Sequence, residues 1–420
     1  PGEYLDSATS TLSPYNRGTS FFPYGNLPLT LVRSAIELTH NDDIGNSKFF
    51  ARQASALADL FTIFLLYLIV SKLYDQRTGL FAAAFSSFAV MQIQQSHFFT
   101  ADSFVLLFMT LTLYFAVGIV GQKAESRFAE RNAESEMQNP LSAFRLQYIV
   151  RSPLFWLSIG FGVALGMAMA SKINAVVLAL MLPGAFLVRY LTVDRGQQTG
   201  KEATVYGQRS TVPDYWSLIA VFLIAGGLAT IISFRIFQPY AFSGLGLNPQ
   251  WVANIREVSG QASGADIPWN LQWARRTHLY SFVNLTVWGL GLPLGILAWA
   301  GFLLMGWRIF KGEYKHLLLW GWTAFYFVWQ SLQFNPTMRY QLPIYPLLAM
   351  MAAWVIFELP QMFKLRNTYY VIRNLTAFIG TIVLILTAIW AFAFQSIYLR
   401  DETRMAASRW IYQNAPGPVN

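Results

Sequence analysis

Cysteine is absent from this chain of 420 residues, and charged side chains are scarce. Without cysteine, the protein forms no disulfide, no thiolate metal site and no cysteine nucleophile. Charged residues make up 12% and hydrophobic residues 55% of the chain, whereas soluble domains carry about 25% charged residues. This balance predicts an all-α polytopic membrane protein, because segments that cross lipid must satisfy their own backbone hydrogen bonds.

The formal net charge of +9 does not indicate a nucleic-acid partner, because the basic residues sit in short loops between apolar runs. Most of them fall in one alternating set of loops, which the positive-inside rule assigns to the cytoplasm. The opposite face keeps longer segments. We therefore expect an integral protein of a prokaryotic cytoplasmic membrane whose active face points outward.

Apolar runs that are long enough to cross a bilayer, roughly 17–25 residues, occur about ten times. They are Arg52–Tyr74, Gly79–Gln95, Ala101–Gly121, Pro153–Ala170, Asn174–Tyr190, Tyr215–Phe237, Ser281–Trp307, His316–Leu332, Tyr340–Phe357 and Tyr370–Phe394.

These runs divide the chain into alternating outer and membrane regions. Residues 1–51 form a first outer loop with an amphipathic helix, and 52–238 hold the first six membrane helices. Residues 239–280 form a second outer loop, and 281–395 hold the remaining four helices. The tail 396–420 could begin a further outer domain. The chain starts at Pro1 without an initiator methionine, so we expect its natural start to lie upstream.

The segment Met338–Pro346 is the most informative one in the chain. It places the guanidinium of Arg339 and the phenols of Tyr340 and Tyr345 at the mouth of a long apolar helix. An ionisable group at a membrane helix end needs an anionic partner or a route to water. Arg339 could extend to lipid phosphates at the membrane surface, or it could belong to a binding site.

Two other polar sites fall on the same predicted face. Asp102 lies in the first turn of a predicted helix, where the helix dipole favours a carboxylate, and His97 precedes it by five residues. Lys172 is the only charge between Arg151 and Arg189. A lone lysine there is more often a functional cation than a solubilising one.

Two cations and a carboxylate near a membrane surface suggest a site for a phosphate-bearing lipid beside an acid–base group. Lys172 and Arg339 would hold the phosphate, with Tyr340 and Tyr345 near the headgroup. Asp102 and His97 would position the sugar or the acceptor. These two side chains could also hold a divalent cation, although two ligands are too few to define a site. No other cofactor is indicated.

Several motifs follow one another in the order of a known family. They are Ser13–Arg17, Tyr24–Pro28, Ala51–Leu57, Gln95–Asp102, Gly162–Gly166, Ser171–Asn174 and Arg339–Pro346. With these motifs the chain resembles the C superfamily of membrane glycosyltransferases, which use polyprenyl-phosphate sugars. It is most similar to protein O-mannosyltransferases and lipid A aminoarabinose transferases.

The resemblance implies a helical fold with one more membrane helix upstream of this chain. It also implies one cavity formed by the first outer loop, the Asp102 turn, Lys172 and Arg339, so Tyr24, Asn26 and Arg52 become substrate-binding candidates. In such enzymes an acidic pair in the first outer loop supplies the catalytic base. Residue 1 of this chain already falls within the resembling loop, so we expect the pair either to lie upstream of Pro1 or to be lost in this protein. Glu3 and Asp6 lie in a different context, and Asp102 therefore resembles the supporting acid.

Two functions remain open. The first is transfer of a sugar from a polyprenyl phosphate to a protein, lipid or glycan acceptor on the outer face. The second is a non-catalytic subunit with a structural or lipid-binding role in a larger membrane complex, which the missing acidic pair favours. A transporter would show paired charges at mid-membrane and internal hydropathy repeats, and the sequence shows neither.

Overall fold

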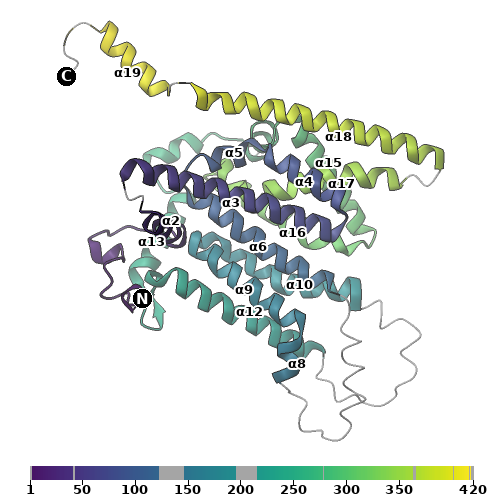
Figure 1. The fold of residues 1–420 in the computed structure, drawn as a ribbon, viewed down its shortest axis with the longest axis horizontal. Coiled ribbons are helices and arrows are strands. Elements are labelled where there is room, and N and C mark those ends of the chain that lie inside the picture. The colour runs from purple at the N-terminus through teal and green to yellow at the C-terminus, as the bar shows by residue number, and fades with distance from the viewer. Residues whose placement is uncertain are drawn as a thin grey trace, which may run out of the picture.

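The protein is a bundle of long helices, seen in a computed structural model (Figure 1). The structure describes residues 2–40, 43–122, 146–194, 215–277, 279–362, 366–400, 402–415 and 417. Its α-helices are α1 (Gly2–Leu5), α2 (Leu27–Leu38), α3 (Ile44–Leu73), α4 (Gln76–Ser87), α5 (Val90–Ser96), α6 (Ala101–Gly121), α8 (Leu146–Arg151), α9 (Pro153–Ser171), α10 (Met181–Arg189), α12 (Tyr215–Phe237), α13 (Pro249–Ala262), α14 (Tyr280–Asn284), α15 (Leu292–Phe310), α16 (Leu317–Ser331), α17 (Tyr345–Glu358), α18 (Arg366–Gln395) and α19 (Thr403–Asn414).

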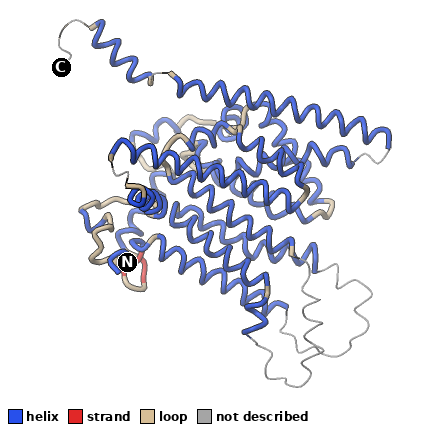
Figure 2. The backbone as a smooth tube through the Cα atoms, viewed as in Figure 1, coloured by secondary structure: helices blue, strands red, loops and turns tan. Residues whose placement is uncertain are grey.

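Short 3₁₀ and π-helical segments connect these helices. They are η1 (Tyr15–Arg17), η3 (Ile173–Leu180), η4 (Tyr190–Asp194), η6 (Pro239–Ala241), η7 (Pro268–Trp273), η8 (Leu285–Gly289), η9 (Tyr314–His316), η10 (Met338–Ile344), η11 (Leu359–Met362) and η12 (Ser396–Leu399). The described strands, β1 (Phe242–Ser243) and β2 (Gly246–Leu247), pair as a small antiparallel hairpin with Phe242 opposite Leu247. Figure 2 shows this hairpin near the N-terminus, with almost everything else helical.

The predicted all-α membrane fold is confirmed. Among the described residues, eight helical stretches are long and apolar enough to cross a membrane. They are Gly45–Leu73, Ala101–Gly121, Pro153–Ser171, Ile173–Val193, Trp216–Phe237, Leu292–Phe310, Met338–Met362 and Tyr369–Asn414. The other two predicted runs are helical as well, but α16 has only 15 residues and the run at 79–95 is broken.

The break in that second run lies between α4 and α5, where Ala89 takes an extended backbone conformation. Polar side chains form hydrogen bonds around this break. The Ser86 hydroxyl donates to Gln92 Oε1 at 2.8 Å, and Gln92 Nε2 donates to Asp59 Oδ1 at 2.9 Å. The prediction of one continuous span over Gly79–Gln95 was therefore wrong. Asp59 lies on α3, so its hydrogen bond with Gln92 ties α3 to the break.

The predicted span Ser281–Trp307 is also interrupted. It contains α14, the π-helical η8 and then Gly291, whose φ of +87° lies in the left-handed region. Glycine reaches that region without the steric cost of a Cβ. Pro293 follows in the first turn of α15, where its missing N–H costs nothing. A new helix thus starts in the middle of the predicted span.

Small residues bring α9 and α12 into close contact. A Cβ on Gly162 would lie 2.1 Å from the Gly226 carbonyl oxygen, and one on Gly166 would lie 2.6 Å from Ser233 Cβ. The Ser233 hydroxyl also donates to the Val163 carbonyl at 2.8 Å. This is the close packing that small residues allow in membrane helices, and it fixes the direction of the α9 terminus.

A second polar cluster lies at the far end of α15 and α17, where Arg308 pairs with Glu358 and, at 2.9 Å, with Glu313. His316 Nδ1 is 2.8 Å from the Tyr74 hydroxyl, and its side chain is fully buried. These contacts tie the loop between α15 and α16 to the ends of α3 and α17.

The C-terminal helices lie at the periphery. Figure 1 shows α18 running along one side of the bundle and α19 extending beyond it. None of the described α19 residues is buried.

Candidate functional site

Lys172 marks the point where α9 ends and η3 begins. Its backbone is extended, with φ −159° and ψ 120°, so the helix direction changes at this residue. Its N–H still donates to the Ala168 carbonyl at 2.9 Å, and its carbonyl accepts from Ala175 N at 3.0 Å. The backbone of Lys172 is therefore held in place at the corner where the helix direction changes. Lys172 thus lies between two helical segments that correspond to the predicted runs Pro153–Ala170 and Asn174–Tyr190.

Asp102 meets Lys172 from the neighbouring helix. It lies in the first turn of α6, and Lys172 Nζ donates to its Oδ1 at 2.7 Å. The Asp102 side chain is 10% exposed and that of Lys172 is 30% exposed. Because the pair is largely removed from water, its attraction is screened less than that of a surface pair.

Arg339 and Tyr340 lie on η10, and both approach the Asp102–Lys172 pair. Lys172 Nζ lies 4.6 Å and the Arg339 guanidinium carbon 5.4 Å from the centroid of the Tyr340 ring. Both distances are typical of cation–π contacts. Arg339 is exposed, and within the described parts of the chain it makes no ion pair.

The helical turn that carries these two residues is anchored from behind. Gln341 is buried, and its Nε2 donates to the Phe327 carbonyl at 3.3 Å and the Ser331 hydroxyl at 3.2 Å. These bonds fasten η10 to the end of α16. The preceding turn is held by Arg276, whose Nε donates to the Phe334 carbonyl at 2.9 Å.

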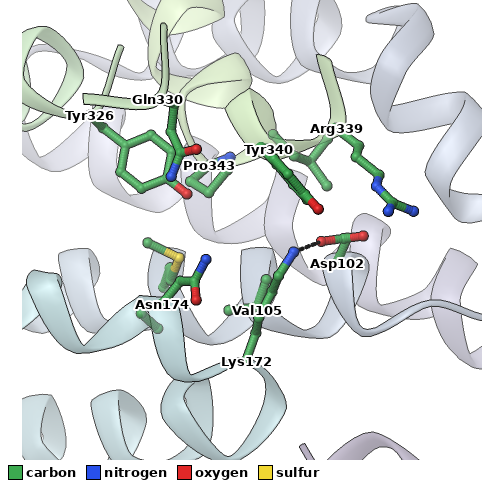
Figure 3. Close-up of a pocket in the computed structure, with 12 residues that line it drawn as sticks. Asp102, Val105, Lys172, Asn174, Tyr326, Gln330, Arg339, Tyr340 and Pro343 are labelled. Carbon is green, nitrogen blue, oxygen red and sulfur yellow. Dashed lines mark hydrogen bonds and ion pairs between the residues drawn. The ribbon is translucent and has the colours of Figure 1, made fainter. Parts of the chain in front are cut away.

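One pocket is lined by Asp102, Lys172, Arg339 and Tyr340 together (Figure 3). The pocket contains about 330 Å³ of empty space, including its open mouth. Its lining consists of Asp102, Val105, Met109, Lys172, Asn174, Ala175, Tyr326, Gln330, Arg339, Tyr340, Leu342 and Pro343. Two cations and one carboxylate give this lining a formal charge of +1. The pocket is therefore suited to an anion that can approach Lys172 and Arg339 together.

The first loop supports the Lys172 corner from outside the pocket. A Cβ on Gly25 would lie 2.1 Å from the Ala170 carbonyl oxygen, so the loop backbone packs directly on the end of α9. Gln238 holds it there: its Oε1 accepts from Asn26 N and its Nε2 donates to the Tyr24 carbonyl at 3.2 Å. Asn26 is buried, whereas the Tyr24 side chain is exposed. Neither residue lines the pocket.

Three other residues that the sequence predicts to bind substrate lie outside the pocket. Tyr345 is fully buried and packs against Gly289. Arg52 is exposed on the first turns of α3. His97 stacks on Tyr398 with ring centroids 4.0 Å apart and planes at 7°. The substrate-binding roles of these three residues stay predictions.

His97 also has both ring nitrogens engaged. Nδ1 is 2.7 Å from the Ile93 carbonyl oxygen, and Nε2 is 3.2 Å from the Gln395 amide. The residue therefore docks α18 and η12 on the end of α5. Among the described residues, no three His, Cys, Asp or Glu side chains gather where they could hold a metal ion. The pairing of His97 with Asp102 around a divalent cation has no support in this geometry.

Sequence reasoning missed Asn174, Tyr326 and Gln330, which line the pocket. Tyr326 and Gln330 lie on α16 and are 5% and 4% exposed. The available signal was weak, because a tyrosine and a glutamine in an aromatic-rich helix do not reveal which neighbour they face. Gln330 is nevertheless a polar residue near the end of an apolar run, where such residues mark binding paths.

The motifs of this chain resemble those of the C-superfamily glycosyltransferases. The comparisons confirm this resemblance. Residues 40–128, which are 89 of the 420, match the family model described as dolichyl-phosphate-mannose-protein mannosyltransferase. This segment includes Asp102. No curated protein matches the chain.

Solved structures resemble the chain over nearly its whole length. The oligosaccharyltransferase of Archaeoglobus fulgidus in its apo form is 14% identical, with a TM-score of 0.56 over 94% of this chain and 50% of its own. The same organism's AglB with an inhibitory peptide and a dolichol-phosphate has a TM-score of 0.55, with the same identity and coverage. ArnT from Cupriavidus metallidurans with undecaprenyl phosphate is 14% identical, with a TM-score of 0.48 over 93% of this chain and 70% of its own.

At this identity the likeness is one of fold. The chain spans half the length of the archaeal oligosaccharyltransferase that it matches.

Proposed function

We propose that this protein transfers a sugar from a polyprenyl-phosphate donor to an acceptor protein, lipid or glycan. The observation that carries the proposal is the pocket in which Lys172 and Arg339 flank Tyr340. An acceptor nucleophile attacks the anomeric carbon, the bond from that carbon to the phosphate oxygen breaks, and the leaving phosphate gains negative charge. Two cations stabilise that charge as it develops.

Asp102 has a supporting role in this proposal. Its carboxylate binds Lys172 Nζ at 2.7 Å, which fixes the ammonium at the pocket wall. The archaeal structure of the same fold contains a dolichol-phosphate, and the family model that matches residues 40–128 is that of dolichyl-phosphate-mannose enzymes. Both observations favour a polyprenyl phosphate as the lipid.

The test is binding and transfer with single variants. Lys172→Ala and Arg339→Ala should each lose at least ten-fold in affinity for polyprenyl phosphate and in sugar transfer. Arg33→Ala is the matched control, because Arg33 is an exposed cation paired with Glu37 on α2 and does not line the pocket. Wild-type affinity in both pocket variants would refute the phosphate-binding role.

A second candidate is a lipid-binding subunit without turnover. Among the described residues, Asp102 is the one carboxylate that lines the pocket, and its engagement with Lys172 favours this candidate. The same protein preparation separates the two functions. Sugar transfer or donor hydrolysis by the purified protein supports the enzyme, whereas tight lipid binding without turnover and stoichiometric co-purification in a complex support the subunit.

We further infer that the pocket opens away from the cytoplasm. The first loop and the β-hairpin lie at the pocket end. Arg308 lies in the last turn of α15, at the opposite end, and Lys311 and Lys315 follow that helix. Basic residues in short loops favour the cytoplasmic side.

A further inference from the structure

The pocket has a charged part and an uncharged part. Figure 3 shows Asp102, Lys172 and Arg339 toward one end, and Tyr326, Gln330 and Asn174 toward the other. Asn174 follows Lys172 by two residues on η3, while Tyr326 and Gln330 lie one helical turn apart on α16. Residues from two separate elements thus place an amide, a phenol and a second amide together, beside the proposed phosphate site.

These side chains have hydrogen-bonding capacity to spare. The Gln330 amide forms a hydrogen bond with the Tyr326 hydroxyl, and both side chains are almost wholly buried. An amide carries two donors and an acceptor, and a phenol carries one of each, so one shared hydrogen bond does not exhaust them. Polar groups in an apolar helix are costly when they stay unpaired. A ligand with several hydroxyl groups would complete their hydrogen bonds.

The charge distribution of the pocket further restricts the chemical class of the ligand. Every charged side chain in the pocket lining is at the other end, and those three residues sum to +1. An ammonium on the ligand would be repelled by Lys172 and Arg339. A carboxylate on the ligand would compete with the phosphate for the same two cations. An uncharged polyol meets neither penalty.

We propose that Asn174, Tyr326 and Gln330 form a subsite for the hydroxyl groups of an uncharged sugar, and that this subsite selects a neutral sugar over an amino sugar or a uronic acid. The inference rests on the proposed function, because the sugar reaches the subsite as part of a glycosyl phosphate held by Lys172 and Arg339.

The test compares the affinities of the purified protein for four lipids that share one polyprenyl chain. They are the bare polyprenyl phosphate and its esters with a neutral hexose, an amino sugar and a uronic acid. The wild type should bind the hexose ester at least ten-fold more tightly than the other two esters. Gln330→Leu and Tyr326→Phe should each reduce the preference for the hexose ester over the bare phosphate by about five- to ten-fold.

The matched control is Thr323→Val. Thr323 is buried on the same helix, its hydroxyl donates to the Leu319 carbonyl at 2.8 Å, and it does not line the pocket. This variant should keep the wild-type preference. Affinity for the bare phosphate should stay within two-fold of wild type in all three variants, which also shows that they fold.

The outcomes separate the two proposals. If wild-type protein binds the bare phosphate but does not distinguish the three esters, the neutral-sugar subsite is wrong and the phosphate site stands. The same conclusion follows if Gln330→Leu and Tyr326→Phe keep the wild-type preference. If wild-type protein binds none of the four lipids, the proposed function fails, and the subsite fails with it.

Discussion

At the scale of single residues, the Lys172 ammonium has two close neighbours, and only one of them competes with an anion for it. The Asp102 carboxylate neutralises it from 2.7 Å, while the Tyr340 ring contacts it from 4.6 Å without removing its charge. An incoming phosphate must therefore share the ammonium with Asp102. Arg339, which has no such carboxylate among the described residues, is the cation that remains free for the first encounter.

Asp102→Asn is expected to tighten polyprenyl-phosphate binding about five-fold, because it removes competition worth about 1 kcal/mol at this partly buried pair. The amide keeps the shape of the carboxylate and loses its charge. Equilibrium binding to the purified protein measures the effect. Glu37→Gln is the control, since Glu37 pairs with Arg33 at an exposed site on α2. Weaker binding in Asp102→Asn would contradict this expectation and show that the loss of lysine alignment outweighs the removal of the competing charge.

His316 gives a prediction about pH. Burial first, and then the cations Lys315 and Arg308, lower the pKa of His316 from 6.5 to about 3. Glu313 would favour the charged ring from 3.5 Å, but burial outweighs it. The folded protein therefore holds a neutral imidazole, while the unfolded chain takes up a proton below pH 6.5. Stability should fall as the pH drops from 6.5, by about 2 kcal/mol at pH 5.

The measurement is thermal or denaturant unfolding in detergent between pH 5 and 7, for wild type and His316→Gln. Glutamine cannot take up this proton and can still bond the Tyr74 hydroxyl. The stability of the wild type relative to the variant should decline as the pH falls. Parallel pH profiles for the two proteins would contradict the assignment.

At the scale of elements, the site depends on three places where regular helix stops: the start of α6, the end of α9 and the 3₁₀ turn η10. Sequence could predict the first and second, because Asp102 and Lys172 adjoin the ends of clear apolar runs. It could not predict the orientation of Tyr345. In a 3₁₀ turn, residues three apart share a face, so Tyr340 and Pro343 both line the pocket, while Tyr345 begins α17 on the side of Gly289.

The contact of the first loop with α9 leads to an element-scale prediction. Gly25→Ala should destabilise the protein by about 1–3 kcal/mol, the usual cost of overpacking, because the new Cβ would lie 2.1 Å from the Ala170 carbonyl oxygen. The backbone on both sides has little freedom to yield. The loop should shift away from Lys172, so polyprenyl-phosphate binding should weaken as well.

Thermal unfolding and lipid binding measure the two effects. Gly227→Ala is the matched control, since a Cβ there meets nothing within 4 Å. Because alanine favours a helix interior over glycine, this variant should not lose stability, and its lipid binding should be unchanged. Equal stability of the two variants would mean that the loop does not depend on this close approach.

At the scale of the whole molecule, composition and hydropathy were sufficient for the fold. Lipid forces apolar runs into helices, and each of the ten predicted runs is helical at least in part. The interruptions at Ala89 and Gly291 were not visible, because side-chain bonds such as Ser86–Gln92 and a single glycine conformation cause them. Likewise, Tyr326 and Gln330 line the pocket because of how α16 packs against its neighbours. No local sequence pattern predicts that packing.

The orientation of the whole bundle remains a prediction, and the absence of cysteine makes it directly testable. Leu245, at the tip of the β-hairpin, is fully exposed, and Lys311 is exposed at the other end of α15. In intact cells or right-side-out vesicles, Leu245→Cys should react with a membrane-impermeant maleimide and Lys311→Cys should not. Both should react after permeabilisation, which controls for accessibility. The reverse pattern would place the pocket on the cytoplasmic face, where the donor and the acceptor would have to be cytoplasmic too.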